Sequence, residues 1–240
     1  MKMCVQYLIV VCLALTLTEA TPASFITKCK WDDSKCIKEV TQKVIPLFAD
    51  GIPELNVDPL DPVLIKHIDA STSNLKLIVT DAKITGLKGC EAKKVQRDIE
   101  KAKLFVKVQC TCDLEGKYDM KGQLFVLPIE GNGDVRAKIR KVVISVEADM
   151  SDKIKDGKKY WTVKSWKHSY ELKDTSDVKF ENLFPDNEFL RTTTDELISK
   201  NGNDVVTEIG QPVIKAVVAK VVANIQHFFA AVPEEDLALL

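Results

Sequence analysis

The sequence has few of the residues and none of the common motifs that carry out enzymatic chemistry. Only three histidines occur in 240 residues, His67, His168 and His227, and they lie far apart in the chain. A GxSxG elbow, an HExxH pair and a cysteine motif with a nearby histidine are all absent, which disfavours the common hydrolase classes. We interpret each histidine as a structural or surface residue. No catalytic residue, metal ligand or cofactor is expected.

The sequence also lacks an excess of charge of either sign. Lys and Arg together number 34 against 35 Asp and Glu, so the formal net charge is −1. A nucleic-acid-binding or polybasic membrane-binding surface needs a clear excess of positive charge, so neither kind of partner is expected. After the first twenty residues no uncharged stretch is long enough to cross a bilayer, which argues against stable membrane insertion.

The first twenty residues have the pattern of a secretory signal peptide. Lys2 supplies a positive start, the stretch 5–17 is almost entirely apolar, and Ala20 is a small residue suited to cleavage before Thr21. The apolar stretch is shorter than a membrane span needs. We therefore predict a signal peptide at 1–20, secretion to an extracellular fluid, and a single domain over 21–240.

Removal of this segment leaves five cysteines, an odd number, so at least one thiol stays unpaired within the chain. Cys29 and Cys36 flank a short polar stretch, and a local disulfide there would hold the start of the first helix. Cys110 and Cys112 share one face of a strand and are poorly placed to bond each other. Cys90 could bridge to either of them, or all three could be buried thiols. Zinc is disfavoured because no CxxC pair is present.

Helical spacing of apolar residues predicts a short N-terminal helix from Ser34 to Phe48. Ser34 is the expected N-cap, and Pro46 should bend or end the last turn. The stretch 50–53, Asp-Gly-Ile-Pro, then stops the helix.

Between Leu75 and Leu172 the dominant period of the apolar residues is two, as in the run 104–110 and the run 142–148. Pro128 marks an edge or bulge in the apolar stretch 124–129. Several long strands joined by short turns indicate an antiparallel sheet. The expected turns are Glu115-Gly116, Gly131-Asn132-Gly133 and Lys155-Asp156-Gly157-Lys158.

The C-terminal region returns to a helical period. From Asp204 to Val232 the pattern is apolar nearly all the way round, which indicates burial on most sides, with a kink at Pro212. A long helix held by a strongly curved sheet satisfies both patterns. The predicted class is therefore α+β: a strongly curved antiparallel sheet wrapped around a long C-terminal helix, with a short N-terminal helix. Side chains could fill the interior of such a fold, or leave a dry tunnel for a long apolar ligand.

The order and spacing of several short segments resemble the takeout and haemolymph juvenile-hormone-binding protein family of insects, over nearly the whole mature chain. These segments are Cys29 and Cys36 before the first helix, 51–55 (GIPEL), 59–62 (PLDP), 84–87 (ITGL), 114–118 (LEGKY), 122–124 (GQL), 127–133 (LPIEGNG) and 228–233 (FFAAVP). A cysteine pair in the C-terminal half, which the hormone carriers have, is missing here. The resemblance is therefore closest to the takeout-like branch.

This resemblance implies the tubular lipid-binding (TULIP-like) fold and a secreted, non-enzymatic carrier of small hydrophobic molecules such as juvenile hormone, other isoprenoids or fatty acids. The alternative is a secreted interaction protein with a filled core that acts through a receptor. For the carrier, Tyr170 or Trp166 is expected to donate a hydrogen bond to a polar ligand head. The tunnel-lining residues predicted from strand alternation and the inner helix face are Val106, Val108, Phe125, Leu127, Val142, Ile144, Trp161, Trp166, Tyr170, Val213, Val217 and Phe228.

Overall fold

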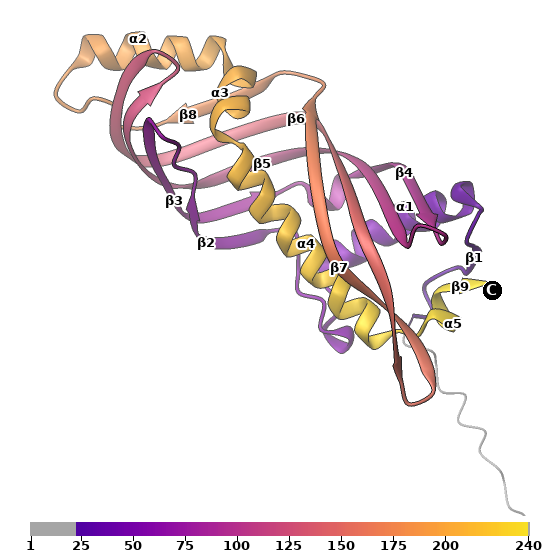
Figure 1. Ribbon diagram of the computed structural model, residues 1–240. Helices are drawn as coiled ribbons and strands as arrows, with labels where there is room; N and C mark the ends of the chain where they lie inside the picture. The colour runs from indigo at the N-terminus through magenta and orange to yellow at the C-terminus, as the bar shows by residue number, and fades with distance from the viewer. Residues whose placement is uncertain (1–22, 240) are drawn as a thin grey trace, which may run out of the picture.

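The computed structural model describes residues 23–239, so the predicted signal peptide lies outside the described residues. Figure 1 shows an elongated molecule with α2 at one end and the chain's C-terminus near the other. The helices are α1 (Ser34–Asp50), α2 (Glu188–Lys200), α3 (Gly202–Ile209), α4 (Gln211–Ala231) and α5 (Glu234–Leu237), with 3-10 turns η1 (Pro53–Leu55) and η2 (Leu87–Gly89). The strands are β1 (Cys29–Lys30), β2 (Val63–Asp69), β3 (Leu75–Thr85), β4 (Glu91–Asp98), β5 (Lys103–Leu124), β6 (Leu127–Lys155), β7 (Lys158–Leu172), β8 (Ser176–Phe180) and β9 (Ala238–Leu239).

Seven of these strands form one antiparallel sheet in the order β2-β3-β5-β6-β7, with β4 added to β5 and β8 added to β6. The two central strands, of 22 and 29 residues, are so long that each has different neighbours along its length. Near one end β5 pairs with β3 and β6 pairs with β8, whereas near the other end β5 pairs with β4 and β6 with β7.

This change of neighbours divides the sheet into two halves. The α2 half comprises β2, β3, β8 and the adjoining parts of β5 and β6, with α2 and α3. The α1 half comprises β4, β7 and the remaining parts of β5 and β6, with α1 and the C-terminal end of α4.

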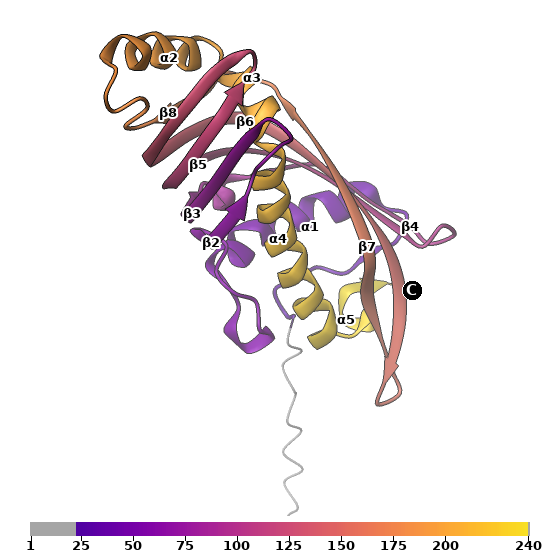
Figure 2. The ribbon, with the colours of Figure 1, turned by 60° about the vertical axis from the view of Figure 1, so that its left-hand side comes forward.

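Helix α4 closes the curve of the sheet. It contacts both β2 and β7, the two strands that end the main path of the sheet, and Figures 1 and 2 show it crossing the concave side. By length and hydropathy α4 could cross a membrane, but here its apolar sides pack on the sheet. The predicted class, a curved antiparallel sheet with a C-terminal helix, is confirmed.

The C-terminal helical region differs in detail from its prediction. The expected single kinked helix is two helices, α3 and α4, separated at Gly210. Pro212 lies in the first turn of α4, where its missing N–H has no intrahelical partner to lose, so it starts a helix. Helix α2 was not predicted, because its sequence has a weak apolar stripe and three consecutive threonines.

Helix α1 also begins differently. Asp33, and not Ser34, is the N-cap, and its carboxylate accepts a hydrogen bond from the backbone N–H of Cys36 at 2.9 Å. The helix continues through Pro46 to Asp50, one turn further than Pro46 suggested, and ends at Gly51 with φ of 85°.

Of the three predicted turns, only the one at 155–158 is a turn; it connects β6 and β7. Glu115-Gly116 and Gly131-Asn132-Gly133 lie inside long strands, where Gly116 pairs with Val135 and Gly133 with Tyr118. A Cβ atom on Gly133 would lie 2.6 Å from the carbonyl oxygen of Glu181, so this glycine admits the backbone that follows β8. Phe125 and Val126 form the actual turn between β5 and β6.

Two disulfides are present. Cys29–Cys36 ties β1 to α1, as predicted, and Cys90–Cys110 ties the start of β4 to β5, which selects one of the alternatives left open by the sequence. Cys112 is the free thiol among the described cysteines. Strand β1 also pairs in parallel with β9, so the described chain ends lie side by side.

Candidate ligand-binding interior

Strand register brings the predicted wall residues of the α1 half together on the concave face. Residues directly opposite each other on paired strands point to the same face of a sheet. Three such rows cross the four strands in the order β4, β5, β6 and β7. They are Ala92-Val108-Ile144-Tyr170, Val95-Val106-Val146-His168 and Arg97-Leu104-Ala148-Trp166.

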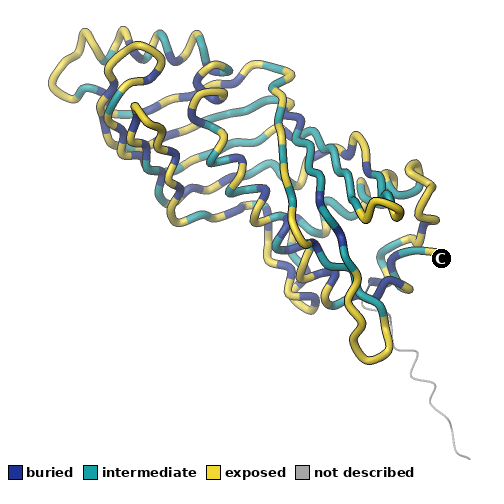
Figure 3. The backbone as a smooth tube through the Cα atoms, viewed as in Figure 1, coloured by how far each residue is buried: buried dark blue, intermediate teal, exposed yellow. Residues whose placement is uncertain are grey.

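These rows form an apolar wall that is incompletely covered. In Figure 3 the intermediate colour follows much of β5 and β6 in this half, and the inner-row residues Val106, Ile144 and Val146 are among those that are half-buried. The latter two pack against a cluster that includes Ile214, Val218 and Val222 of α4, yet they remain partly exposed. Eight of the twelve predicted wall residues are half-buried: Val106, Val108, Ile144, Trp161, Trp166, Tyr170, Val213 and Val217. Of these, Val213 and Val217 on α4 pack against the core of the α2 half.

Two further predicted residues are fully buried and help to close the ends of this wall. Val142 packs beside the Cys90–Cys110 disulfide. Phe228 lies at the end of α4, where its ring meets Phe48 of α1 edge-on at 5.1 Å between centroids. Trp161 and Phe229 form a second edge-on pair at 5.3 Å, so aromatic rings cluster at this end of the interior.

The remaining two predicted residues do not belong to the wall. Phe125 lies in the β5–β6 turn and Leu127 is the first residue of β6, and their side chains are 38% and 39% exposed. The prediction assumed one continuous strand through 124–129, whereas the chain reverses there with a φ of 57° at Phe125. We therefore leave both residues out of the candidate site.

Helix α1 covers the wall from the side of β4. Its Ile45 packs against Cys90, Cys110 and Val142, and its Phe48 against Phe228. Gln42 fixes the helix to the open edge of β4: its side-chain amide donates to the carbonyl of Cys90 at 3.1 Å and accepts from the N–H of Ala92 at 2.7 Å. These two bonds satisfy backbone groups that an edge strand would otherwise expose.

A buried charge cluster lies at the aromatic end. Glu234 of α5 is 5% exposed and accepts a hydrogen bond from the indole N–H of Trp161 at 2.8 Å. The Arg97 guanidinium lies 3.4 Å from the same oxygen and 3.8 Å from the Trp161 ring centroid, and Lys159 pairs with the other oxygen at 3.0 Å. Burial acts to raise the pKa of Glu234, but these bonds and charges outweigh it and lower the pKa overall.

The polar groups expected to orient a ligand are arranged differently from the prediction. The Tyr170 hydroxyl donates to the carbonyl of Val206 at 3.2 Å, so it already has a partner, and burial raises its pKa. His168, which sequence reasoning treated as structural or surface, lies in the central row of the wall between Trp166 and Tyr170. Its alternation with these two residues was the signal that could have identified it.

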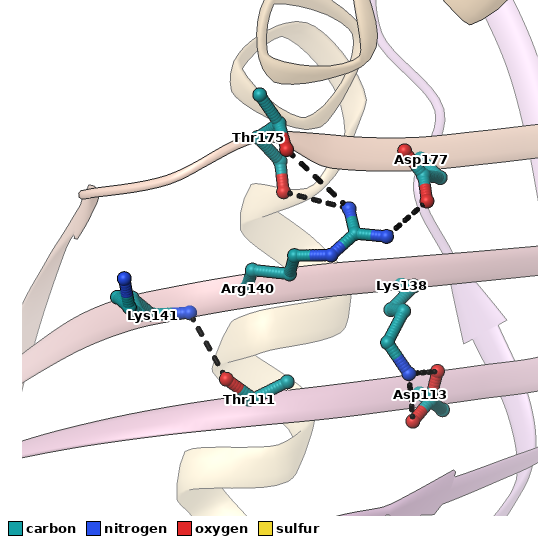
Figure 4. A network of polar contacts seen from close by, with 7 residues as sticks. All are labelled: Thr111, Asp113, Lys138, Arg140, Lys141, Thr175 and Asp177. Atoms are coloured by element: carbon teal, nitrogen blue, oxygen red, sulfur yellow. Dashed lines mark hydrogen bonds and ion pairs between the residues drawn. The ribbon is translucent and has the colours of Figure 1, made fainter.

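The outer face of the sheet is polar. Figure 4 shows two polar contacts on this face. The Asp113 carboxylate accepts a hydrogen bond from the Lys138 ammonium group at 2.9 Å. The Arg140 guanidinium donates to the Asp177 carboxylate at 2.5 Å and to the carbonyl of Thr175, the residue before β8. Since α4 lies behind the sheet in this view, these polar side chains point away from the helix. The apolar residues of the sheet pack with α4 on the other face. This alternation is what a sheet with one wet face requires.

Two clefts of about 430 Å³ each open elsewhere on the sheet. The first lies where α2 meets β5, β6 and β8, and its lining includes Leu114, Val178 and Ile198. The second crosses β5, β6 and β7, and most of its lining side chains belong to outward-facing rows, such as Lys107, Ser145 and Lys167. Its lining also includes Val106, Val146 and His168 of the central wall row. Among the described residues, no group of three or more His, Cys, Asp or Glu side chains is placed to hold a metal ion.

Comparison with known proteins supports this architecture. The family model for haemolymph juvenile hormone binding protein matches residues 7–239. The chain belongs to this family. Its relatives include the circadian clock-controlled protein daywake of Drosophila melanogaster and of Drosophila yakuba, each 26% identical over 225 residues, which cover 88% of this chain and 86% of the relative.

Two further family relatives connect the chain to named binding proteins and to a solved fold. The juvenile hormone-binding protein of Manduca sexta is 29% identical over 84 residues, 34% of this chain and 37% of that protein. The crystal structure of Epiphyas postvittana Takeout 1 matches with a TM-score of 0.86 and 27% identity, and covers 90% of this chain and all of that one. The predicted family, fold class and takeout resemblance are thereby confirmed.

Proposed function

We propose that this protein is a secreted, non-enzymatic carrier that holds a hydrophobic ligand in the α1 half of its interior. The observation that carries the proposal is the half-buried apolar wall of Val106, Val108, Ile144 and Trp166 on the concave face. A ligand that covers such a wall gains roughly 25 cal/mol for each Å² of apolar surface removed from water, less the cost of ordering it.

The family supports this ligand class, since its model is described as juvenile hormone binding and one relative carries that name. Isoprenoids and fatty acids are therefore the ligand classes to examine first. The two disulfides support an extracellular location, because such bonds persist in oxidising compartments.

The first experiment is organic extraction of the natively secreted protein, followed by mass spectrometry of the released molecules. A stoichiometric apolar molecule would support an occupied interior and identify its chemical class. An empty extract, followed by failure of added isoprenoids and fatty acids to bind, would favour the alternative of an interaction protein that acts through a receptor.

A pair of tryptophan substitutions locates the site. Val146→Trp places a large ring on the inner wall and should reduce ligand uptake at least about tenfold, because it occupies the space a ligand needs. Ser169→Trp is the matched control, since Ser169 is exposed on β7 beside the same row and faces outward. Val217→Trp, with the exposed Ala219→Trp as its control, tests whether the site extends along α4 to the α2-half core against which Val217 packs. Equal uptake by folded Val146→Trp and Ser169→Trp proteins would show that the ligand does not bind against this part of the wall.

A further inference from the structure

The central row of the wall contains one polar side chain with an unsatisfied atom. His168 lies opposite Val146 on β6, and its neighbours on the same face of β7 are Trp166 and Tyr170. Its Nε2 atom is shielded from water and has no hydrogen-bond partner among the residues that the structure describes. A buried nitrogen without a hydrogen-bond partner destabilises the protein by its lost hydration. A hydrogen bond from a ligand group would offset this loss, so Nε2 is a candidate contact for a polar group of the ligand.

The surroundings of His168 favour an uncharged imidazole. Burial lowers its pKa, and the positive charge of Lys215 on α4 lowers the pKa further. A neutral imidazole presents one donor and one acceptor nitrogen, so it can bond a hydroxyl, ester, ketone or ether oxygen. The Trp166 ring, 5.7 Å away between centroids, provides an apolar flank beside that oxygen.

A ligand carboxylate would have no free buried cation to pair with at this position. Two cations lie near this position: Arg97 is already bound to Glu234 and stacked on Trp161, and Lys215 of α4 is exposed to solvent. A ligand carboxylate buried beside neutral His168 would therefore carry a large desolvation cost. Within residues 23–239, the other two buried side-chain atoms that lack partners are Ser176 Oγ and Asn203 Oδ1, in β8 and α3 of the α2 half, away from this wall.

We propose that His168 hydrogen-bonds an uncharged oxygen of the bound ligand and thereby makes the interior selective for neutral oxygenated lipids over hydrocarbons of the same shape. This inference rests on the proposed carrier function and adds to it the polar contact that determines ligand chemistry.

The test uses calorimetry at pH 7.4 with the full mature chain and compares farnesol with farnesene. The two share a carbon skeleton, but farnesene lacks the hydroxyl group and has one more C=C bond. Wild type should bind farnesol more tightly than farnesene by about fivefold to tenfold, the usual worth of one neutral hydrogen bond. His168→Phe, which keeps the ring and removes both nitrogens, should abolish this preference while farnesene binding changes less than about twofold. His168→Gln should retain part of the preference, and Ser169→Ala, whose side chain faces outward, should retain all of it.

The outcomes separate the two proposals. If farnesene and farnesol bind wild type equally, or the preference persists in folded His168→Phe, the role of His168 is wrong while the carrier function stands. If neither compound nor any fatty acid binds wild type, the carrier function fails and this inference fails with it. Imidazole carbon NMR of wild type checks the contact without a substitution: farnesol should shift the His168 signal and farnesene should not. An unmoved signal with farnesol bound would overturn the proposal.

Discussion

The two halves of the sheet share the strands β5 and β6 but bury their inner side chains to different extents. In the α2 half the inner rows contain Leu77, Val79, Tyr118 and Met120, all at most 4% exposed. In the α1 half the corresponding positions, such as Leu104 and Val146, stay half-buried.

The difference follows from what covers each half. In the α2 half, α3 and the segment after β8 press onto the concave face, and Leu183 and Val205 have no exposed surface. In the α1 half the cover is α1 and α4, and Ile214, Val218 and Val222 of α4 belong to the cluster against which several wall residues pack. One sheet thus combines a fully buried core in the α2 half with an apolar inner face in the α1 half whose residues stay partly exposed.

The largest expected effect concerns Cys112, which lies where the two halves of the sheet meet. It packs against residues of both the main α2-half core and the Cys90–Cys110 cluster. Burial, followed by the nearby charges of Asp61 and Asp113, raises the pKa of Cys112 to about 12. Because the thiolate is the reacting form, alkylation by iodoacetamide at pH 8 should be about a thousandfold slower in the folded protein than in urea. Rapid labelling of folded protein would mean that the open interior extends to this residue.

A matched pair of truncations should separate the halves by stability. Leu77→Ala removes a fully enclosed side chain and should lower the free energy of unfolding by about 3–4 kcal/mol. Leu104→Ala removes the same atoms from a half-buried position and should cost about 1–2 kcal/mol, since less transfer free energy and no closed cavity are involved. Urea unfolding of both variants measures the difference, and equal losses would contradict a distinction between the halves.

The buried charge cluster should hold the aromatic end of the α1 half together. Glu234→Ala leaves Arg97 buried without its anion and should cost about 3 kcal/mol at pH 7, whereas Glu235→Ala, at an exposed neighbour, should cost under about 0.5 kcal/mol. Thermal and urea unfolding of the two variants provide the comparison. Similar losses for both would show that the cluster contributes little.

The same cluster predicts a dependence of stability on pH. The folded-state pKa of Glu234 lies below its unfolded value, so its contribution is complete above the unfolded pKa and is lost as pH falls through the folded pKa. The stability difference between wild type and Glu234→Gln should therefore shrink below about pH 4.5. A difference that stays constant from pH 7 to pH 3 would contradict this ionisation.

The smallest expected difference in the free energy of unfolding comes from larger side chains on the inner face of each half. Val79→Phe adds atoms to a packed row and should cost about 2 kcal/mol, whereas Val146→Phe extends into the open wall and should cost under about 1 kcal/mol. Urea unfolding again measures both. A larger cost at Val146 would indicate that the α1 half is packed as tightly as the α2 half.

Local pattern was enough to predict part of this structure. Period-two alternation identified β5, β6 and β7 and placed Val106, Ile144 and Trp166 on a common inner face. The Cys29–Cys36 bond was predictable because the two cysteines are only seven residues apart. The expected turn at Gly131–Gly133 was wrong because that signal has two causes: glycine permits a turn, but it also permits another backbone to approach, as Glu181 does here.

The sequence by itself determined the strands, the apolar C-terminal helix and the lack of catalytic motifs, because these depend on residue type and spacing along the chain. Tertiary structure alone decided that Cys90 bonds Cys110, that Phe125 leaves the wall and that His168 joins it with an unpaired nitrogen. It also decided how deeply each half of the sheet buries its inner residues. Burial depends on which segments from distant parts of the chain cover a face, and alternation within one strand carries no information about that cover.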